Sequence, residues 1–493
     1  MNPAGLKTAE EGVVAHAEAT WGEAGRTSAG ALLVVLPDGV GIRNFLHGPF
    51  IHQASEAGQV RILYTIPEHI LEAYHLSMGD QVKWDALIPY RDRAFPLMLR
   101  KSLSYAQMYW ADTRSMRFKL KQQRGETWRG KAGNAAARLI GQAAASARGI
   151  KLLDSWHCAA VSRLPEVEHY RRLFAEVKPS LLFCSHQRPL TVLPPVLAAK
   201  EMGVPTATFI FSWDNLTSKD RIAAPFDHYL VWSDHMRQEL LRYYPDINSE
   251  QIHVVGTPQF DSYADPKLAR PREEFFRRIG GDPARPLICY SGSDVTTCPE
   301  DPEYVRLLMR LIRSGRVRKQ PQVILRPSPV DEGSRYNEVR REFPELIYAL
   351  PAWVHIEPHQ WSSVVPLPED VEFLANLIRH SDLNVNLAST MTIDYALHDK
   401  PVVNIAFDVS EPPPSGVPLW DYYYQFEHYR PVVEIGAARF ARSAEDLADH
   451  INTYLENPTL DRANRRRLVE LEVGVPLGQS SRRIFEVLKS IAH

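Results

Sequence analysis

Short apolar runs alternate with longer amphipathic stretches along most of the chain from residue 29 onward. This alternation is typical of buried parallel strands joined by helices. Between the first two runs, residues 37–44 predict a loop, and a short helix is then expected to reach about Glu56, interrupted at Gly48 and Pro49. The runs of the first half cover residues 31–36, 60–66, 180–184, 205–211, 229–232 and 253–255.

A second series of runs follows a polar linker at residues 262–272. The two series predict an α/β protein in which two Rossmann-like parallel-sheet domains face a central cleft. We expect a mobile tail at residues 1–28, a first domain at 29–265 with a basic insertion at 98–151, and a second domain at 273–493. The second series covers residues 287–290, 322–325, 383–387 and 402–407, with amphipathic helices at 444–455 and 480–491.

Composition and charge are those of a soluble globular enzyme with two or three domains. Of the 493 residues 44% are hydrophobic and 24% charged, and the formal net charge of −2 argues against a nucleic-acid-binding protein. Cys158, Cys184, Cys289 and Cys298 show no paired spacing, so we expect reduced thiols without a zinc site or a disulfide framework. The sequence has no long apolar run and no hydrophobic signal core, which predicts a cytoplasmic protein.

Residues 384–407 contain the clearest candidate for a phosphate site. A buried strand ends in a small polar turn with Ser389 and Thr390, and a short helix and a second strand follow. Hydroxyl groups and free N–H groups at the start of a helix are suited to phosphate. Asp394, about one turn further on, is placed to accept hydrogen bonds from a ribose or sugar hydroxyl. The alternative is an ordinary N-capped helix of a parallel α/β domain.

Two other strand ends of the second series also carry groups that are suited to bind a diphosphate. Gly292 lacks side-chain bulk, so the backbone N–H groups around it can contact a diphosphate, although a plain tight turn is the alternative. Arg326 follows an apolar strand and is suited to hold a diphosphate by two parallel hydrogen bonds, with a structural ion pair as the alternative. We find no Asp-x-Asp metal pair in a suitable loop, and we expect neither a metal nor a separate cofactor. The predicted ligand-binding set is Ser291, Gly292, Ser293, Arg326, Ser328, Ser389, Thr390, Met391 and Asp394.

Five segments of the chain resemble glycosyltransferases of the GT-B type, which have two Rossmann-like domains. The similarity is to bacterial surface-polysaccharide enzymes and to CDP-glycerol glycerophosphotransferases, and it covers roughly residues 180–490. The glycerophosphotransferases have a histidine in the segment where this chain has Arg326 to Pro329, a departure that favours a nucleotide-sugar donor. The segments are residues 211–219, 253–261, 289–294, 325–329 and 389–394.

This resemblance implies a function in surface glycan or glycolipid synthesis. The expected reaction is an inverting, metal-independent transfer of a sugar from a nucleotide-sugar donor, bound by residues 273–493, to a hydroxyl of a glycan or lipid-linked acceptor on the side of residues 29–265. A nucleotide-sugar epimerase and a CDP-glycerol-type glycerophosphotransferase are the alternatives among enzymes. A non-catalytic nucleotide-sugar-binding protein is the alternative of another class, since a fold of this type can hold a ligand without chemistry.

The candidates for the base that activates the acceptor follow strand ends of the first series. Asp38 comes almost directly after the first strand and ranks first, although an aspartate between Pro37 and Gly39 is also a common turn former. His186 follows the run at 180–184 and ranks second. Asp214, after the run at 205–211, is a third candidate, which either contacts the acceptor or fixes the domain interface.

Residues 98–151 differ from the rest of the chain in charge. They contain twelve basic and two acidic residues, an excess of ten in a nearly neutral protein, and aromatic residues lie between the charges. Such a segment is suited to an anionic membrane surface, where a lipid-linked acceptor would be found, and the protein would then be peripheral at the inner face of the membrane. A solvated helical face and an RNA-contacting patch are the alternatives, and the bulk charge makes nucleic acid the less favoured partner.

Overall fold

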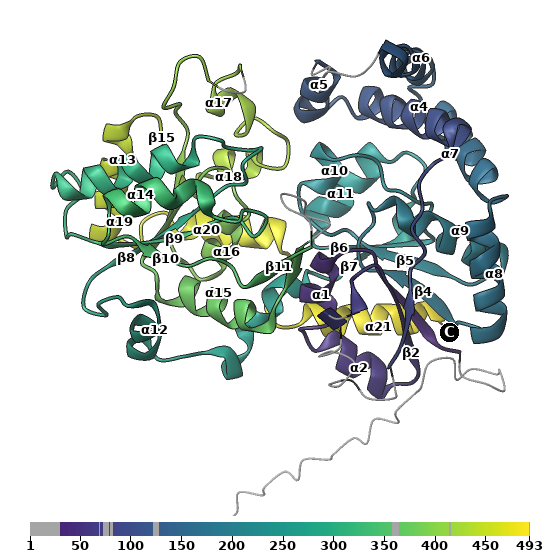
Figure 1. Ribbon diagram of the computed structural model, residues 1–493, viewed down its shortest axis with the longest axis horizontal. Helices are drawn as coiled ribbons and strands as arrows, with labels where there is room; N and C mark the ends of the chain where they lie inside the picture. Colours follow the sequence, from purple (N-terminus) through teal and green to yellow (C-terminus); the bar gives the residue numbers. More distant parts are fainter. Residues whose placement is uncertain are drawn as a thin grey trace, which may run out of the picture.

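The computed structural model describes residues 30–68, 70–71, 78, 82–121, 128–356, 364–413 and 416–492 (Figure 1). The tail predicted at residues 1–28 lies outside the described residues, as do residues 122–127 of the predicted basic insertion. Two parallel sheets with their helices lie side by side in the molecule. The α/β class and the two Rossmann-like sheets expected from the sequence are confirmed.

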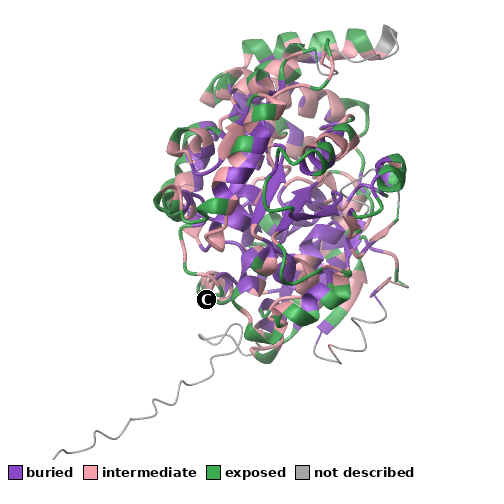
Figure 2. Ribbon diagram, turned by 90° about the vertical axis from the view of Figure 1, so that its left-hand side faces the viewer, coloured by how far each residue is buried: buried purple, intermediate pink, exposed green. Residues whose placement is uncertain are grey.

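The first sheet has seven parallel strands in the order β3-β2-β1-β4-β5-β6-β7. The winding direction changes between β1 and β4, so these two neighbours form the switch point of the sheet, and Val35 of β1 is paired with Cys184 of β4. Every residue of β1 and β4 is buried, as expected for central strands covered on both faces. Figure 2 shows that buried residues gather inside the molecule and that exposed residues lie on its outer helices and loops. The strands are β1 (Leu32–Leu36), β2 (Val60–Tyr64), β3 (Val82–Ala86), β4 (Leu181–Cys184), β5 (Thr206–Phe209), β6 (His228–Val231) and β7 (Ile252–Val254).

The second sheet has six parallel strands in the order β10-β9-β8-β13-β14-β15, which repeats the same winding pattern. Its switch point lies between β8 and β13, where Ser291 is paired with Asn386. A separate antiparallel pair joins β11 to β12. The strands of this half are β8 (Leu287–Ser291), β9 (Gln322–Arg326), β10 (Ile347–Tyr348), β11 (Trp353–His355), β12 (Val364–Pro366), β13 (Leu383–Asn386), β14 (Val402–Ile405) and β15 (Arg439–Ala441).

Helices surround both sheets, and an additional group of them covers one end of the first sheet (Figure 1). The helices of the candidate site, the basic insertion and the contacts between the halves are α1 (Gly39–Phe45), α2 (Phe50–Glu56), α4 (Ala94–Ala111), α5 (Arg114–Lys121), α6 (Trp128–Ala143), α7 (Ala147–Val161), α10 (Asn215–Ser218), α15 (Pro368–His380), α16 (Met391–Leu397), α17 (Leu419–Tyr422), α18 (Arg430–Ile435), α20 (Arg462–Glu472) and α21 (Ser480–Ala492). The others are α8 (Pro165–Val177), α9 (Leu193–Glu201), α11 (Asp234–Tyr243), α12 (Arg272–Ile279), α13 (Asp301–Arg313), α14 (Asn337–Glu342) and α19 (Ala444–Glu456).

The prediction of a loop directly after β1 is wrong, because residues 39–45 form α1. Asp38 begins this helix: its backbone is extended, and its carboxylate accepts a hydrogen bond from the Gly41 N–H at 3.4 Å. Two glycines in seven residues disfavour a helix in isolation, but burial of Ile42 and Phe45 in the core stabilises it here. The predicted interruption at Gly48 and Pro49 does separate α1 from α2.

The last helix, α21, packs against the first half of the chain although it ends the second. It contacts α2, β4 and the 3₁₀ helix at Pro258–Ala264, and it crosses below the first sheet in Figure 1. The Asp261 carboxylate accepts hydrogen bonds from the N–H groups of Ser480 and Ser481, at 3.1 and 2.7 Å, which fixes the start of α21. The sequence assigned residues 273–493 to one domain and did not predict that α21 packs on the first sheet. The amphipathic pattern of a helix does not indicate which sheet the helix covers.

Helices α4 to α7 form most of the predicted basic insertion. α4 packs along α6 and α7 around a small core that includes Leu99, Leu103 and Ile150. Within the residues that the structure describes, no helix has both the length and the apolar character needed to cross a bilayer.

Candidate functional site

Asp38 and His186 lie together at the switch point of the first sheet. Asp38 is two residues beyond the end of β1, and His186 is two residues beyond the end of β4. Because β1 and β4 are parallel neighbours in register, both side chains emerge at the same edge of the sheet. The Asp38 Oδ2 and His186 Nδ1 atoms are 2.5 Å apart. The structure therefore joins the two residues that ranked first and second as candidates for the base.

The environment of this pair fixes the orientation of the imidazole. Asp38 is 2% exposed and His186 8% exposed, and the ring of Phe211 lies 4.9 Å from that of His186. A carboxylate can only accept, so Nδ1 donates to Asp38, and a neutral ring then keeps its lone pair on Nε2. This Nε2 is buried and has no hydrogen-bond partner among the described residues. Other buried polar atoms of the described residues, such as Thr257 Oγ1 and Asn404 Nδ2, also lack a partner. What distinguishes Nε2 is its place at the switch point of the sheet and the orientation that Asp38 imposes on its ring.

Asp214, the third candidate, lies apart from this pair. Its carboxylate is 3.2 Å from the Lys219 ammonium group and accepts a hydrogen bond from the Ser218 hydroxyl at 3.2 Å. Burial opposes its ionisation, but the nearby Lys219 and His428 outweigh burial and hold the pKa of Asp214 below its usual range. Burial also lowers the pKa of His428 to about 4. An ionised, paired aspartate of this kind fixes its own loop, and among the described residues no hydrogen bond or ion pair joins it to Asp38 or His186.

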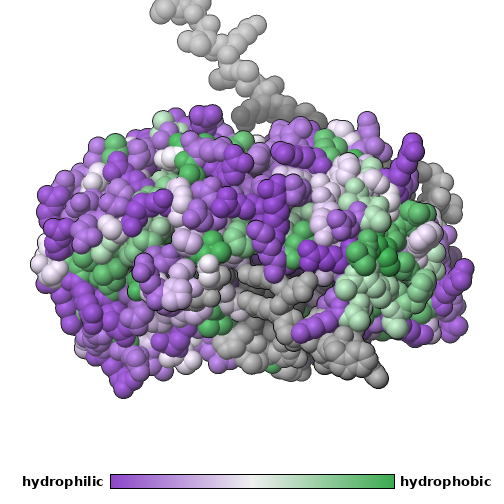
Figure 3. Space-filling model, turned by 90° about the horizontal axis from the view of Figure 1, so that it is seen from above, coloured by the Kyte–Doolittle hydropathy of each residue, from purple (hydrophilic) through white to green (hydrophobic). Residues whose placement is uncertain are grey.

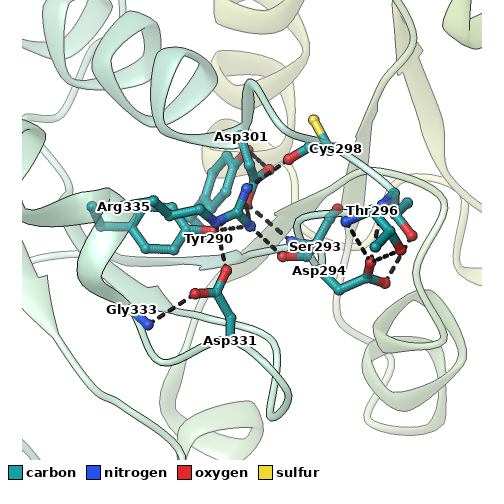
Figure 4. A network of polar contacts seen from close by, with 11 residues as sticks. Tyr290, Ser293, Asp294, Thr296, Cys298, Asp301, Asp331, Gly333 and Arg335 are labelled. Atoms are coloured by element: carbon teal, nitrogen blue, oxygen red, sulfur yellow. Dashed lines mark hydrogen bonds and ion pairs between the residues drawn. The ribbon is translucent and has the colours of Figure 1, made fainter. Parts of the chain in front are cut away.

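The turn after β8 is held by a buried carboxylate (Figure 4). Asp301 accepts from the Ser293 N–H at 3.0 Å and from the Tyr290 hydroxyl at 2.7 Å, and burial raises its pKa. The Ser293 carbonyl in turn accepts a hydrogen bond from the Arg335 guanidinium. Ser291, at the end of β8, is buried, and its hydroxyl accepts from the Asn384 side chain at 2.8 Å. The turn is therefore fixed by contacts within the protein.

Gly292 has a structural role in the same turn. Its N–H donates to the carbonyl of Arg326 at 2.8 Å, so the N–H groups of Gly292 and Ser293 are both engaged and neither is free for a diphosphate. A side chain at position 292 would lie 2.6 Å from the Tyr336 hydroxyl, which explains the glycine without any ligand. The alternative of a plain tight turn is thus what the structure shows for the backbone of this loop.

Arg326 lies at the end of β9 and is buried, and its partner is a carboxylate. Its Nη2 donates to both oxygens of Asp370, at 3.0 and 2.9 Å. Asp370, on α15, also accepts from the Trp353 indole N–H at 2.7 Å and from the Ala352 N–H at 2.9 Å. The alternative of a structural ion pair is thus what the structure shows, although Nη1 of Arg326 has no hydrogen-bond partner among the described residues. Ser328 is buried two residues further on.

The predicted phosphate loop between β13 and α16 lies at the switch point of the second sheet. Ser389 accepts a hydrogen bond from the Met391 N–H at 3.3 Å, and its own N–H donates to Asn386 at 3.0 Å. The Thr390 hydroxyl accepts from the indole N–H of Trp213, at 3.1 Å, and this bond crosses from one half of the molecule to the other. The loop that was predicted to hold phosphate therefore also contacts the segment that leads into Asp214.

Asp394 lies on the buried side of α16 and not on an open ribose site. Its carboxylate accepts a hydrogen bond from the Tyr263 hydroxyl. Burial raises the pKa of Asp394 to about 6, although the bond from Tyr263 and the charge of Arg43 act in the opposite direction. Arg43 donates to Gln259 at 2.7 Å.

The contacts of Arg43, Tyr263 and Trp213 were not predicted from the sequence. Each partner is more than 100 positions away along the chain, and of the three residues only Trp213 lies in a segment that resembles GT-B enzymes, residues 211–219. Gly39 shows the same closeness between the halves, because a Cβ atom there would overlap the carbonyl oxygen of Val364 in β12. The only other local signal was the position of Arg43 and Trp213 a few residues beyond strand ends, where functional side chains gather in parallel sheets.

Comparison with known proteins gives the fold a wider context. No protein-family model matches the sequence, and no curated protein matches it. A solved UDP-N-acetylglucosamine 2-epimerase has a TM-score of 0.51 and 12% identity, over 93% of this chain and 95% of that one. The UDP-GlcNAc 2-epimerase of Neisseria meningitidis, bound to UDP-GlcNAc, has a TM-score of 0.51 and 12% identity, over 93% and 100%. A glycosyltransferase of Rickettsia africae has a TM-score of 0.49 and 13% identity, over 94% and 98%.

The similarity to the two epimerases extends over nearly the whole of each chain, and it therefore includes both sheets and their connections. Identities of 12% establish a common fold and no more. Together with the repeated strand order of the two sheets, they show that this chain has the GT-B fold.

Proposed function

We propose that this protein is a glycosyltransferase that moves a sugar from a nucleotide-sugar donor to an acceptor hydroxyl, with His186 as the base and Asp38 as the residue that positions it. The observation that carries the proposal is the contact of 2.5 Å between Asp38 Oδ2 and His186 Nδ1, together with an Nε2 that lacks a partner in the described part of the chain. A carboxylate that holds one ring nitrogen leaves the other as a proton acceptor in a fixed orientation. This assignment reverses the order in which the sequence ranked the two residues.

The proposed reaction is a single displacement at the anomeric carbon. The acceptor hydroxyl transfers its proton to Nε2 as its oxygen bonds to the anomeric carbon, and the bond from that carbon to the diphosphate breaks with the electron pair leaving on the phosphate. One displacement inverts the configuration. The hydroxyls of Ser293, Ser389 and Thr390, all at strand ends of the second sheet, would stabilise the departing diphosphate.

Because Nε2 is buried, we propose that the two halves separate to give the substrates access to it. The start of α1 is in contact with β12, as the close approach at Gly39 shows, and this contact lies directly beside Asp38. We therefore expect donor and acceptor to enter an opened form and the halves to close over them, a movement that excludes water from the reaction.

The donor class is supported by the hydroxyls of Ser389 and Thr390 at the second switch point and by the fold similarity to two UDP-N-acetylglucosamine 2-epimerases. A thermal-shift screen with nucleoside diphosphates and nucleotide sugars tests this part, because a ligand that binds only the folded state raises its stability by mass action. The donor should raise the melting temperature at concentrations well above its Kd. If none of the nucleotides or nucleotide sugars does so, the proposed donor site is wrong.

A nucleotide-sugar epimerase is the second candidate, favoured by the whole-length similarity to the two epimerase structures. The two activities differ in their substrates and in the products that they release. An epimerase converts the nucleotide sugar alone and releases no nucleotide in a complete turnover, whereas a transferase releases the nucleoside diphosphate and needs an acceptor or water.

We further propose that helices α4, α6 and α7 dock on an anionic membrane surface. Six large hydrophobic side chains of residues 94–161 are exposed, and Figure 3 shows hydrophobic residues gathered at this side of the molecule. The exposed basic residues Lys131, Arg148 and Lys151 lie on the same helices. Apolar side chains next to basic ones are suited to the boundary between lipid headgroups and acyl chains. The six are Phe95, Trp110, Leu139, Ile140, Leu152 and Trp156.

Replacing Leu139 and Leu152 together by serine is expected to weaken binding to vesicles with anionic lipid about tenfold or more, since both side chains are largely exposed and available to lipid. Vesicle sedimentation at low and high salt measures the change. Leu350→Ser is the matched control, because Leu350 is 49% exposed, as is Leu152, but lies outside these helices. If the double variant binds anionic vesicles as well as the wild type does, or if the wild type binds neutral and anionic vesicles equally well, the proposed docking surface is wrong.

A further inference from the structure

A cavity of about 680 Å³ lies between helix α5 of the basic insertion and the segment that contains α17 and α18. It is lined from both halves of the molecule, with Arg114, Arg117 and Lys121 on one side and Tyr424, Glu427 and Arg430 on the other. The cavity is separate from the Asp38 and His186 pair, since neither residue lines it.

The cationic lining comes from one face of α5. Arg114, Arg117 and Lys121 are spaced by three and four residues, which places them on the same side of the helix. The opposite side of α5 is anchored to the first half, where Ser115 donates to the Thr217 carbonyl at 2.7 Å and Lys119 lies 3.2 Å from Asp220. This anchoring holds the three charges toward the cavity.

The three cationic side chains differ in whether they form an ion pair with a carboxylate. Arg117 is held by Asp112 through two short hydrogen bonds. For the side chains of Arg114 and Lys121 no ion pair is found within the part of the chain that the structure describes. Lys121 is exposed and Arg114 partly buried, so both cations are free to contact a bound anion by charge-assisted hydrogen bonds, which are stronger than those between neutral groups.

Two carboxylates also line the cavity; each has one partner, and the Oε2 atom of Glu427 is buried without a hydrogen-bond partner among the described residues. Glu434 is 2.7 Å from Arg430, and one oxygen of Glu427 accepts from the Arg114 N–H at 2.7 Å. The lining therefore has four cationic and two anionic side chains, an excess of two positive charges. Phe118 closes one wall, with its ring 4.9 Å from that of Tyr422.

The cavity adjoins the predicted phosphate loop of the second sheet. Tyr424, which lines it, accepts a hydrogen bond at its hydroxyl from the Ala388 N–H at 3.3 Å, one residue before Ser389. On the other side, Thr113 donates to the Thr217 carbonyl at 2.7 Å, and Thr217 belongs to α10, which begins directly after Asp214. Hydrogen bonds thus connect the walls of the cavity to the loop that contains Ser389 and to α10, which follows Asp214.

We infer that this cavity binds a phosphate or diphosphate group of the acceptor, and that Arg114 and Lys121 are its principal ligands. The acceptor role rests on the proposed transferase function, whereas the binding of the anion does not. The location also agrees with an acceptor carried by lipid, since α5 packs against α4, one of the helices proposed to contact the membrane.

Calorimetric titration with inorganic diphosphate tests the site in the full-length protein. The double variant Arg114→Ala, Lys121→Ala should bind diphosphate about tenfold or more weakly than the wild type, because it loses two charge-assisted contacts. The matched control is Lys267→Ala with Arg277→Ala, which removes the same charge from exposed positions outside the cavity and outside the helices proposed to contact the membrane. Unchanged melting temperatures confirm that both variants fold.

Three results would overturn the inference: no binding by the wild type, equal binding by the cavity variant, or an equal loss in the control variant of Lys267 and Arg277, which would indicate general attraction only. Thermal shifts with nucleotide sugars, measured on the same variants, separate this outcome from the proposed function. Loss of diphosphate binding with the nucleotide-sugar shift retained supports the cavity, and a missing nucleotide-sugar shift in the wild type refutes the donor site alone. Free diphosphate and lipid-linked diphosphate are distinguished by repeating the titration with vesicles that contain a polyprenyl diphosphate.

Discussion

The variant His186→Ala is expected to retain donor binding and to lose turnover by about 10²- to 10⁴-fold, the usual contribution of a positioned general base. Asp38→Asn should lower turnover by roughly 10²-fold or more, since asparagine lacks the negative charge that stabilises the protonated ring. Asparagine is as good a helix cap as aspartate, so α1 should remain intact in this variant. Steady-state rates together with nucleotide-induced thermal shifts separate chemistry from binding.

The opposite pattern would contradict the assignment of roles. If Asp38→Asn is inactive and His186→Ala is nearly as active as the wild type, Asp38 is the base and His186 only positions it. Asp214→Asn serves as a comparison, because Asp214 is paired with Lys219 and, within the described part of the chain, is not bonded to either residue. We expect its effect on turnover to be the smallest of the three.

Arg326→Ala is expected to destabilise the folded protein by about 3–5 kcal/mol, the usual result of removing one partner from a buried ion pair. Asp370 would keep its bonds from Trp353 and Ala352 but would lose the guanidinium that balances its charge. Chemical denaturation monitored by fluorescence measures the loss, and Arg326→Lys should recover part of it. Arg318→Ala is a control that breaks an exposed ion pair with Glu456 and should change stability little.

A different result for Arg326 would support the role expected from the sequence, which is to bind a diphosphate. If Arg326→Ala unfolds at the same denaturant concentration as the wild type but no longer binds nucleotide, the guanidinium serves the ligand and the pair with Asp370 is incidental. Such a contact would be made through Nη1, which no hydrogen bond engages among the residues that the structure describes.

The fold was largely predictable because its central strands are buried on both faces. Continuous apolar runs such as those of β1 and β4 identify such strands directly. β3, β10 and β15 were not predicted, since they lie at sheet edges and their sequences are shorter or more polar. The helix α1 was missed because its glycines disfavour it locally and only tertiary burial stabilises it.

The candidate site was predictable residue by residue but not in its pairings. Asp38 and His186 were both identified from strand ends, yet 148 positions separate them, and the sequence does not state that β4 returns to lie beside β1. The same limit applies to Arg326, whose partner Asp370 lies 44 positions away on α15. Local chemistry identifies candidate groups, whereas the three-dimensional arrangement decides whether a partner within the protein already satisfies them.

The measurement that tests the central claim most directly is product analysis by ³¹P and ¹H NMR after incubation with the nucleotide sugar that gives the largest thermal shift. The account predicts release of nucleoside diphosphate, slow with water alone and faster with a phosphate-bearing glycan or lipid acceptor, and lost in His186→Ala. Conversion of the nucleotide sugar to an epimer without release of nucleotide would contradict the transferase and establish the second candidate. Binding without any conversion, with and without acceptors, would contradict catalysis of either kind.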